Sequence, residues 1–333
     1  MTEAMFYEKL EGGDVRCGLC NHFCRIKPNK RGICGVRENE NGTLETLVYG
    51  KLIAMHVDPI EKKPLYHFMP GHLSYSIATA GCNFRCLHCQ NAEISQMPSE
   101  KGIIPGEEVE AERVVAEALA AGCKSIAYTY TEPTIFFEYA LDVSKLAAER
   151  GLKNVFVSNG YMSEEATRLI EPYLDAINVD LKGDDEFYKK VCGARLDPVK
   201  RTIELMWSLG IWVEVTTLVI PGYNDSDQKL REIAEFLVGI SPEIPWHVTA
   251  FRPTYKLKDA PPTSAKTIRQ ATEIGRNAGL SYVYGGNIPG EDENTVCPSC
   301  GETLVERFSF RVARNSVVEG KCPKCGEGVA GVW

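Results

Sequence analysis

Eleven of the thirteen cysteines in this 333-residue sequence fall into three tight groups, and this clustering constrains the fold more than any other feature. The N-terminal group is Cys17, Cys20, Cys24 and Cys34, the central group is Cys82, Cys86 and Cys89, and the C-terminal group is Cys297, Cys300, Cys322 and Cys325. In a reducing compartment, clustered cysteines indicate metal or redox sites rather than disulfides. We therefore expect a chain that binds metal in at least two places.

The composition excludes several classes of protein. With 44% hydrophobic and 25% charged residues, the chain is typical of soluble globular proteins and unlike disordered or collagen-like ones. Its 37 basic and 45 acidic residues give a net charge of −8, which favours neither nucleic acid nor an anionic membrane as a partner. No run approaches the roughly 18 apolar residues of a membrane helix, and residues 1–14 lack the apolar core of a secretory signal. We expect a cytoplasmic protein of about two or three domains.

Three regions are predicted: a cysteine-rich region at 1–70, an α/β core at 71–290, and a small metal-binding region at 291–333 that follows an acidic hinge at 290–294. The predicted core strands are 74–79, 125–130, 154–158, 176–180, 212–220, 246–251 and 281–284. The predicted helices between them are 107–121, 135–150, 163–173, 198–209, 226–238 and 265–278. Repeated strand–helix units predict a parallel sheet, either open or closed into a barrel.

The central group has the spacing C-x3-C-x2-C and directly follows the first predicted core strand. Three thiolates this close together can hold three irons of a [4Fe–4S] cube and leave the fourth iron without a protein ligand. An open iron can chelate a substrate, whereas a fully ligated cluster can only pass electrons. The alternatives are a zinc site, for which His88 is the nearest fourth ligand, and an ordinary ferredoxin-type cluster.

The segment CNFRCLHCQN resembles the radical S-adenosylmethionine (SAM) superfamily. The resemblance implies a partial (β/α)6 TIM-like barrel and a site-differentiated [4Fe–4S] cluster whose open iron binds the amino and carboxylate groups of SAM. It also implies reduction by a protein such as flavodoxin or ferredoxin, cleavage of SAM to methionine and a 5′-deoxyadenosyl radical, and hydrogen abstraction from a substrate. In a barrel, such chemistry lies at the carboxyl ends of the strands.

The same resemblance gives roles to residues near the first strand ends. His88 stands where the family usually has an aromatic residue, and its ring would pack on the adenine. Glu132 keeps one position of a Gly-Gly-Glu motif whose backbone carbonyls receive the SAM amino group, and Tyr130 and Thr131 replace the glycines. The loop 220–225 would cover the adenine. The plainer interpretations are a strand-to-helix loop at 130–134 and a Pro-Gly turn at 221–222.

Further strand ends carry polar residues. Ser158 and Asn159 are candidates for hydrogen bonds to the ribose or carboxylate of SAM, with an ordinary turn as the alternative. Asp180 and Lys182 alternate with apolar residues and should share the interior face, either as cofactor or substrate contacts or as a buried salt bridge. His247 falls where the activating enzymes of the superfamily place a histidine near SAM, although a lone strand histidine is also a common core residue.

The C-terminal group consists of two C-x2-C knuckles, with a predicted hairpin at 304–312 between them. Two such knuckles supply four thiolates to one tetrahedral ion and predict a zinc ribbon or rubredoxin-like site. Zinc is favoured over iron because closed thiolate sites are mostly structural. A domain of about 40 residues could hardly fold without such a metal.

The N-terminal group also suits one tetrahedral ion, and zinc is the first interpretation. A second Fe–S cluster is the sharper alternative, and unliganded thiols are the third. Residues 16–37 contain six basic side chains and no acidic one, which is either a solvated face or a docking patch for a partner, an electron donor or a phosphate.

Outside the three groups, residues 58–68 are predicted to be an extended linker wrapping the barrel, with Glu61 or Lys62 as possible substrate contacts. The ungrouped Cys123 is expected to be buried. Cys192 follows a short helix and could approach the substrate.

Taken in order, GxCGVR, DPIEKKPLYHF, CNFRCLHCQN, TYTEPT, SNGY, DLKG, PWH and the terminal knuckles resemble the AmmeMemoRadiSam system radical SAM family, which is similar to pyruvate formate-lyase activating enzymes. That resemblance makes Memo-like and Amme-like proteins candidate partners. Three functions follow as hypotheses: a radical SAM enzyme with an unidentified substrate, a glycyl-radical activase, and a non-catalytic Fe–S and zinc scaffold or electron-transfer protein.

Overall fold

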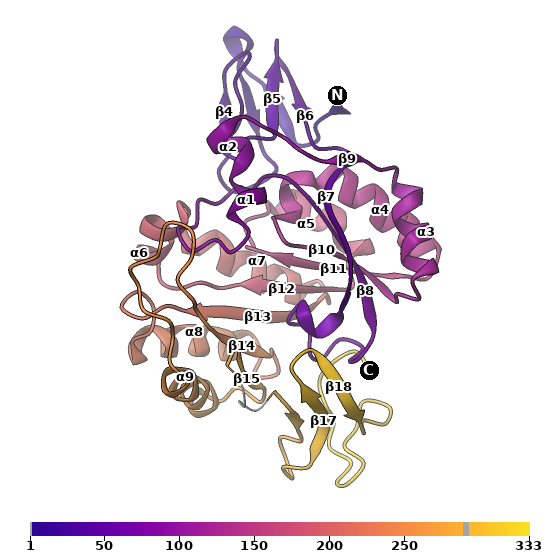
Figure 1. The fold of residues 1–333 in the computed structure, drawn as a ribbon, viewed down its shortest axis with the longest axis vertical. Helices are drawn as coiled ribbons and strands as arrows, with labels where there is room; N and C mark the ends of the chain where they lie inside the picture. The colour runs from indigo at the N-terminus through magenta and orange to yellow at the C-terminus, as the bar shows by residue number, and fades with distance from the viewer. Residues whose placement is uncertain (1, 289–292) are drawn as a thin grey trace.

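The computed structural model describes residues 2–288 and 293–333. Its centre is a mixed α/β layer around one large sheet, with the N-terminal strands at one end and the C-terminal hairpin at the other (Figure 1). The mixed α/β class predicted from the sequence is confirmed. The predicted boundary between residues 290 and 291, and most of the acidic hinge, lie outside the described residues.

The large sheet has the order β15-β14-β13-β12-β11-β10-β8-β7-β9. Its parallel strands are β8 (Leu73–Thr79), β10 (Ser125–Tyr128), β11 (Lys153–Ser158), β12 (Ala176–Asp180), β13 (Trp212–Val219), β14 (Trp246–Ala250) and β15 (Val283–Gly286). These are the predicted core strands in the predicted order, with ends that differ by at most two residues. Because β15 and β9 are the edges of this order, curvature into a partial barrel stays a prediction.

Helices alternate with these strands, as predicted. The long ones are α3 (Ala111–Ala120), α4 (Phe137–Glu149), α5 (Glu164–Ile170), α7 (Leu196–Ser208), α8 (Asp227–Ile240) and α9 (Ala265–Ala278). Shorter helical turns are η1 (Glu11–Gly13), η2 (Ile60–Lys62), α1 (Ala92–Ser95), α2 (Met97–Lys101), η3 (Pro133–Phe136), η4 (Glu171–Tyr173), α6 (Asp185–Phe187) and η5 (Tyr188–Cys192). Ser163 and Ser226 cap α5 and α8 by accepting hydrogen bonds from the N–H groups of Ala166 and Lys229.

Two antiparallel strands extend the sheet beyond β8. They are β7 (Lys51–Pro59), which pairs with β8, and β9 (Glu107–Glu108), which pairs with β7. The predicted linker is therefore wrong over residues 58–62, because Asp58 and Pro59 end β7 and the next three residues form η2. Proline is tolerated there because it lies at the strand end. The predicted boundary at residue 70 consequently falls inside the β7–β8 connection.

The N-terminal strands form two small sheets, β1-β6-β5 and β2-β3-β4. Their bounds are β1 (Thr2–Glu3), β2 (Tyr7–Lys9), β3 (Val15–Cys17), β4 (Arg25–Ile26), β5 (Arg37–Glu40) and β6 (Thr43–Thr46). A buried ion pair between Arg37 and Glu138 joins this end to α4. The N–H of Met5 donates to the same carboxylate at 2.7 Å.

The C-terminal strands β16 (Thr295–Val296), β17 (Thr303–Phe308) and β18 (Arg311–Asn315) form a third small sheet, and the predicted hairpin is confirmed. Tyr66, Tyr282 and Tyr284 pack with buried residues of this sheet and its knuckles. No helix among the described residues has the length and apolar character needed to cross a bilayer.

Candidate active site at the carboxyl edge of the sheet

The central cysteine group lies on the loop that follows β8, at the carboxyl edge of the parallel strands. β8 ends at Thr79, and Cys82, Cys86 and Cys89 lie within the next ten residues. In parallel α/β sheets, ligands bind outside the carboxyl ends of the strands. The loop therefore stands where such a fold binds its ligands.

This loop is fixed against the connection between β12 and α7. The N–H of Arg85 donates to the carbonyl of Cys192 at 2.8 Å, and the N–H of Leu87 donates to that of Val191 at 2.9 Å. Between them, the Cys86 thiol lies against the Cys192 thiol. This contact is the largest cause, and burial the second, of the rise in the pKa of Cys86 well above its ordinary value.

The other two thiols of the group are also held protonated at neutral pH. Burial, the Glu132 carboxylate and the Cys86 thiol raise the pKa of Cys82 well above its ordinary value. Burial raises the pKa of Cys89, whose sulfur lies 3.2 Å from the Ser95 hydroxyl. A metal ion reverses this preference, because a coordinating thiol is deprotonated outright. Without a metal, the environment therefore disfavours free thiolate nucleophiles at these positions.

Glu132 joins two neighbouring strand ends. Its buried carboxylate accepts hydrogen bonds from the Ser158 hydroxyl and the Asn159 N–H, both at 2.8 Å. It also accepts from the hydroxyl of Thr134 at 2.6 Å. Burial raises the pKa of Glu132. The structure therefore brings Glu132, Ser158 and Asn159 together, and the Glu132 carboxylate connects the two strand ends.

Asn159 connects this network to the cysteine loop. Its side-chain amide donates to the Asn83 side-chain oxygen at 2.7 Å and lies 3.9 Å from the Cys82 sulfur. The backbone carbonyl of Asn83 accepts a hydrogen bond from the His22 ring at 2.8 Å. These hydrogen bonds connect the end of β11 through Asn83 to His22 in the N-terminal region.

Tyr130 and Thr131 also lie beside the cysteine loop. Tyr130 has φ +62, which is a rare backbone conformation for a tyrosine, and its carbonyl accepts from the Asn91 amide at 2.7 Å. Its hydroxyl donates to Asp58 on β7. The Thr131 hydroxyl donates to the Thr79 carbonyl at the end of β8, at 2.8 Å.

Asp180 and Lys182 face the same side, as predicted, and form an ion pair of 2.6 Å. Burial lowers the pKa of Lys182, but the charges of Asp180, Cys86 and Cys192 outweigh burial and raise it well above its ordinary value. Asn224, in the loop after β13, donates to the Lys182 carbonyl at 2.6 Å. The predicted adenine-covering loop is thereby tied to the Asp180 strand end.

His88 is buried, and its Nδ1 has no hydrogen-bond partner. Burial and the nearby Lys182 charge lower its pKa to about 3, so the ring is neutral at physiological pH. The Phe187 ring lies 5.8 Å away in a tilted arrangement.

His247 lies elsewhere. It is the second residue of β14, near the amino end of the strand, and its Nε2 hydrogen-bonds the buried Glu214 carboxylate at 2.6 Å. Its ring stacks on Tyr284 at 5.2 Å. The structure therefore holds His247 in a core network and does not join it to the residues around Cys82.

A cavity adjoins the hydrogen bond between His247 and Glu214. His247 lines it together with Glu61, Arg252 and Arg307, between the sheet and the C-terminal hairpin. Glu61 is buried, and its carboxylate accepts from the Gly71 N–H at 2.8 Å. Lys62, the other predicted substrate contact, instead pairs with Asp58 at 2.8 Å.

The C-terminal cysteines meet at one point. Cys297 and Cys325 sulfurs are 3.6 Å apart, and those of Cys300 and Cys322 are 3.8 Å apart. A tetrahedral zinc ion at about 2.3 Å from each sulfur requires sulfur separations of about 3.8 Å. The group has the size of a single-metal site, and zinc as its occupant stays a prediction.

Sequence reasoning missed Asn83 and Asn224 as residues of the site, and it named Cys192 as a possible substrate neighbour without its contact with Cys86. Asn83 lies inside the cysteine motif, and Asn224 lies inside the predicted loop, so both could have been suspected from position alone. The approach of Cys192 to Cys86 depends on how two distant loops pair, and no local signal in the sequence announces it.

Comparison with known proteins places the site in a family. Residues 76–237 match the family model described as the Radical SAM superfamily. An uncharacterized protein of Methanocaldococcus jannaschii is 47% identical over 331 residues, which cover 98% of both chains. The 4-hydroxyphenylacetate decarboxylase activating enzyme of Clostridium scatologenes is 26% identical over 117 residues, which cover 34% of this chain and 37% of that enzyme.

Among solved structures, Streptococcus suis SuiB bound to S-adenosylmethionine superposes with a TM-score of 0.53 at 13% identity. The match covers 72% of this chain and 56% of that one. At this identity the likeness concerns the fold alone.

Proposed function

This chain belongs to the radical SAM superfamily, and from that premise we propose that it is an enzyme whose central cysteine group holds a site-differentiated [4Fe–4S] cluster. The cluster, when bound and reduced, supplies the electron that cleaves SAM to methionine and a 5′-deoxyadenosyl radical, which abstracts hydrogen from a substrate. The observation that carries the proposal is the position of three buried or half-buried thiols on the loop at the carboxyl edge of the sheet, within the matched residues.

The chain's own residues fit this role. The sulfurs of the central group do not all lie within 4.8 Å of one another in the part of the chain that the structure describes, so they are spaced more widely than around one zinc ion. His88 Nδ1 is buried without a partner and is available to a ligand. We assign contact with SAM to His88 of the cysteine loop and to the strand-end residues Tyr130, Thr131, Ser158, Asn159, Asp180 and Lys182.

Glu132 and Asn224 act differently in this proposal. The side chains of both residues are already hydrogen-bonded to strand ends and loops. They therefore position the carboxyl edge of the sheet and do not touch SAM. His247, joined to Glu214, has a supporting role in the core.

A glycyl-radical activase is the second candidate. The similarity to the 4-hydroxyphenylacetate decarboxylase activating enzyme favours it, although that similarity covers only a third of this chain. Membership of the AmmeMemoRadiSam system, with Memo-like and Amme-like partners, a flavodoxin or ferredoxin as reductant and a cytoplasmic location, completes the proposal.

Anaerobic reconstitution tests the proposal. With dithionite and SAM, the full chain should release 5′-deoxyadenosine, and Cys86→Ala should release none, whereas the control Cys123→Ala should behave like the parent. Absence of the product from a protein with a full complement of iron would overturn both enzyme hypotheses. A glycyl-type EPR doublet on an added partner protein would favour the activase.

A further inference from the structure

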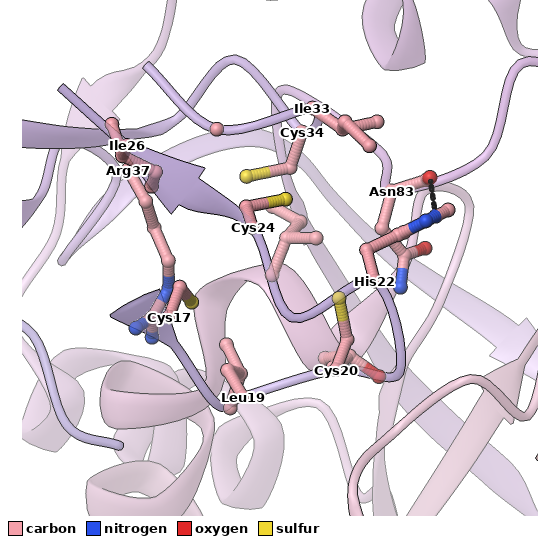
Figure 2. A pocket seen from close by; sticks show the side chains of 13 residues that line it. Cys17, Leu19, Cys20, His22, Cys24, Ile26, Ile33, Cys34, Arg37 and Asn83 are labelled. Carbon is pink, nitrogen blue, oxygen red and sulfur yellow. Dashed lines mark hydrogen bonds between the residues drawn. The ribbon is translucent and has the colours of Figure 1, made fainter. Parts of the chain in front are cut away.

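The N-terminal cysteine group lines a cavity at the junction of the N-terminal strands and the sheet. Figure 2 shows the four cysteines around one space, with aliphatic side chains such as Leu19, Ile26 and Ile33 between them. The empty space is about 350 Å³, part of it open to solvent. A water-sized sphere can occupy only about 20 Å³ of it, so the lining side chains, and not a large void, define the site.

The spacing of the sulfurs separates this group from the C-terminal one. Within residues 2–288 and 293–333, the C-terminal group is the one set of three or more cysteine, histidine or acidic side chains whose ligand atoms all lie within 4.8 Å of one another. No three sulfurs of the N-terminal group meet that condition. A single tetrahedral zinc ion needs every pair at about 3.8 Å. A four-iron cube places each thiolate on a different corner and keeps the sulfurs apart.

Two buried donors on the cavity lining lack acceptors. Arg37 and Asn83 are each 1% exposed, and Arg37 Nε and Asn83 Nδ2 have no hydrogen-bond partner. The other guanidinium nitrogens of Arg37 donate to Met5 O and Glu138. Buried unpaired donors are costly, and sulfides or thiolates in the cavity would accept from them. Figure 2 shows the Arg37 guanidinium beside Cys17.

We propose that the N-terminal cysteine group holds a second [4Fe–4S] cluster, with one cysteine on each iron. Unlike the central group, it leaves no corner open, so its cluster exchanges electrons and does not chelate SAM. Residues 16–37 contain six basic side chains and no acidic one, and of these Arg37 lines the cavity. In this proposal iron and sulfide take the place of the zinc ion that is the first interpretation of the cysteine spacing.

Metal counting on the full chain tests the proposal. After anaerobic reconstitution with ferrous iron and sulfide, the parent should carry about eight irons, four for each cluster, and about one zinc. The triple variant Cys82→Ala/Cys86→Ala/Cys89→Ala should keep about four irons, because the N-terminal group is intact. Cys17→Ala/Cys20→Ala should also keep about four, in the central group, and Cys123→Ala should keep all eight.

Electron paramagnetic resonance adds a second measurement. The dithionite-reduced triple variant should show a [4Fe–4S] signal that SAM does not change, because every corner is already ligated. A triple variant that binds no iron and about two zinc ions would overturn the proposal, and so would a signal that SAM shifts. This result does not depend on whether the Cys17→Ala/Cys20→Ala variant folds. Failure of SAM cleavage by the parent, with four irons retained by the triple variant, would instead defeat the proposed function alone.

Discussion

Asp58 and Lys63 form a nearly buried ion pair of 2.7 Å at the end of β7. Burial lowers the pKa of Lys63 to about 8, so the ammonium is still mostly charged at pH 7. Burial alone would raise the pKa of Asp58, but hydrogen bonds from Lys62, Lys63 and Tyr130 outweigh it and hold the pKa below its ordinary value. The pair therefore links β7 to the candidate site through Tyr130.

We expect Asp58→Asn to lower the free energy of unfolding by about 3 kcal/mol at pH 7, because the Lys63 charge loses its buried partner. In the parent, the unfolded chain takes up the Asp58 proton first, so this contribution is complete above about pH 5 and is lost as the pH falls. The difference between the two proteins should shrink between pH 5 and pH 3 in urea unfolding. The matched control Lys62→Ala removes an exposed partner and should cost under about 1 kcal/mol. Parallel pH profiles for parent and Asp58→Asn would contradict this account.

Substitution of Cys192 distinguishes a central cluster with three protein ligands from one with four. If its contact with Cys86 is only packing, Cys192→Ala should keep the iron of the central group and cleave SAM within a few-fold of the parent. Loss of that iron would mean that Cys192 occupies the fourth corner, which the proposed chemistry needs open. Iron content and 5′-deoxyadenosine release are the measurements.

At the scale of single residues, the sequence predicted which polar residues lie at strand ends better than it predicted what each of them contacts. Glu132, Ser158 and Asn159 do come together, because they lie at or just after the ends of two parallel strands that end at the same edge. His247 does not join them, because its position in the strand, and not its residue type, decides which end of the sheet it reaches.

Gly81 shows why the cysteine loop follows β8 so closely. It has φ +112, and a Cβ there would lie 2.8 Å from Val36 Cγ1. Glycine alone permits both the backbone conformation and the close approach of the N-terminal segment.

Gly81→Ala should therefore cost about 3 kcal/mol, from backbone strain and overpacking together, and should reduce the iron bound by the central group. Gly122→Ala is the matched control, since Gly122 also has positive φ but nothing lies within 4 Å of its added Cβ. It should cost only about 1 kcal/mol. Equal losses in urea unfolding would show that the contact with Val36 is unimportant.

Elements of the core were predictable because buried parallel strands are short apolar runs, separated here by helices with clear ends. Gly151, Gly210 and Gly279 all have positive φ after α4, α7 and α9, as expected of helix stops. The predicted helix at 107–121 starts later because Glu107–Glu108 pair with β7. Such pairing between distant segments leaves no periodicity in the sequence.

At the scale of the whole molecule, the C-terminal sheet is docked by polar contacts. The Arg307 guanidinium donates to the Tyr66 carbonyl at 2.7 Å, and the His67 ring hydrogen-bonds the Ala330 carbonyl at 2.6 Å. These contacts join segments more than 200 residues apart, so no local pattern of residues could predict them.

Treatment with a metal chelator should release about one zinc ion per chain from the C-terminal group. It should also unfold residues 293–333, because so small a unit cannot bury enough apolar surface alone. Limited proteolysis of Cys322→Ser, followed by mass spectrometry, should find cuts in that region while residues 2–288 stay protected. Cys123→Ser should show neither effect. A protease-resistant C-terminal region without metal would refute the structural role.

The docking of the N-terminal region also bears on the order of events during translation. The Leu19 carbonyl accepts from the Ser163 N–H at 3.0 Å, and the Asn21 N–H donates to the Tyr161 carbonyl at 3.0 Å. The ribosome synthesises the first four cysteines long before it synthesises Tyr161 and Ser163, so these contacts form only later. The lining around those sulfurs includes Thr134 and Ile135, so it is complete only after residue 135 has emerged, and a metal centre enclosed there would be assembled late although its four cysteines are the first to be synthesised.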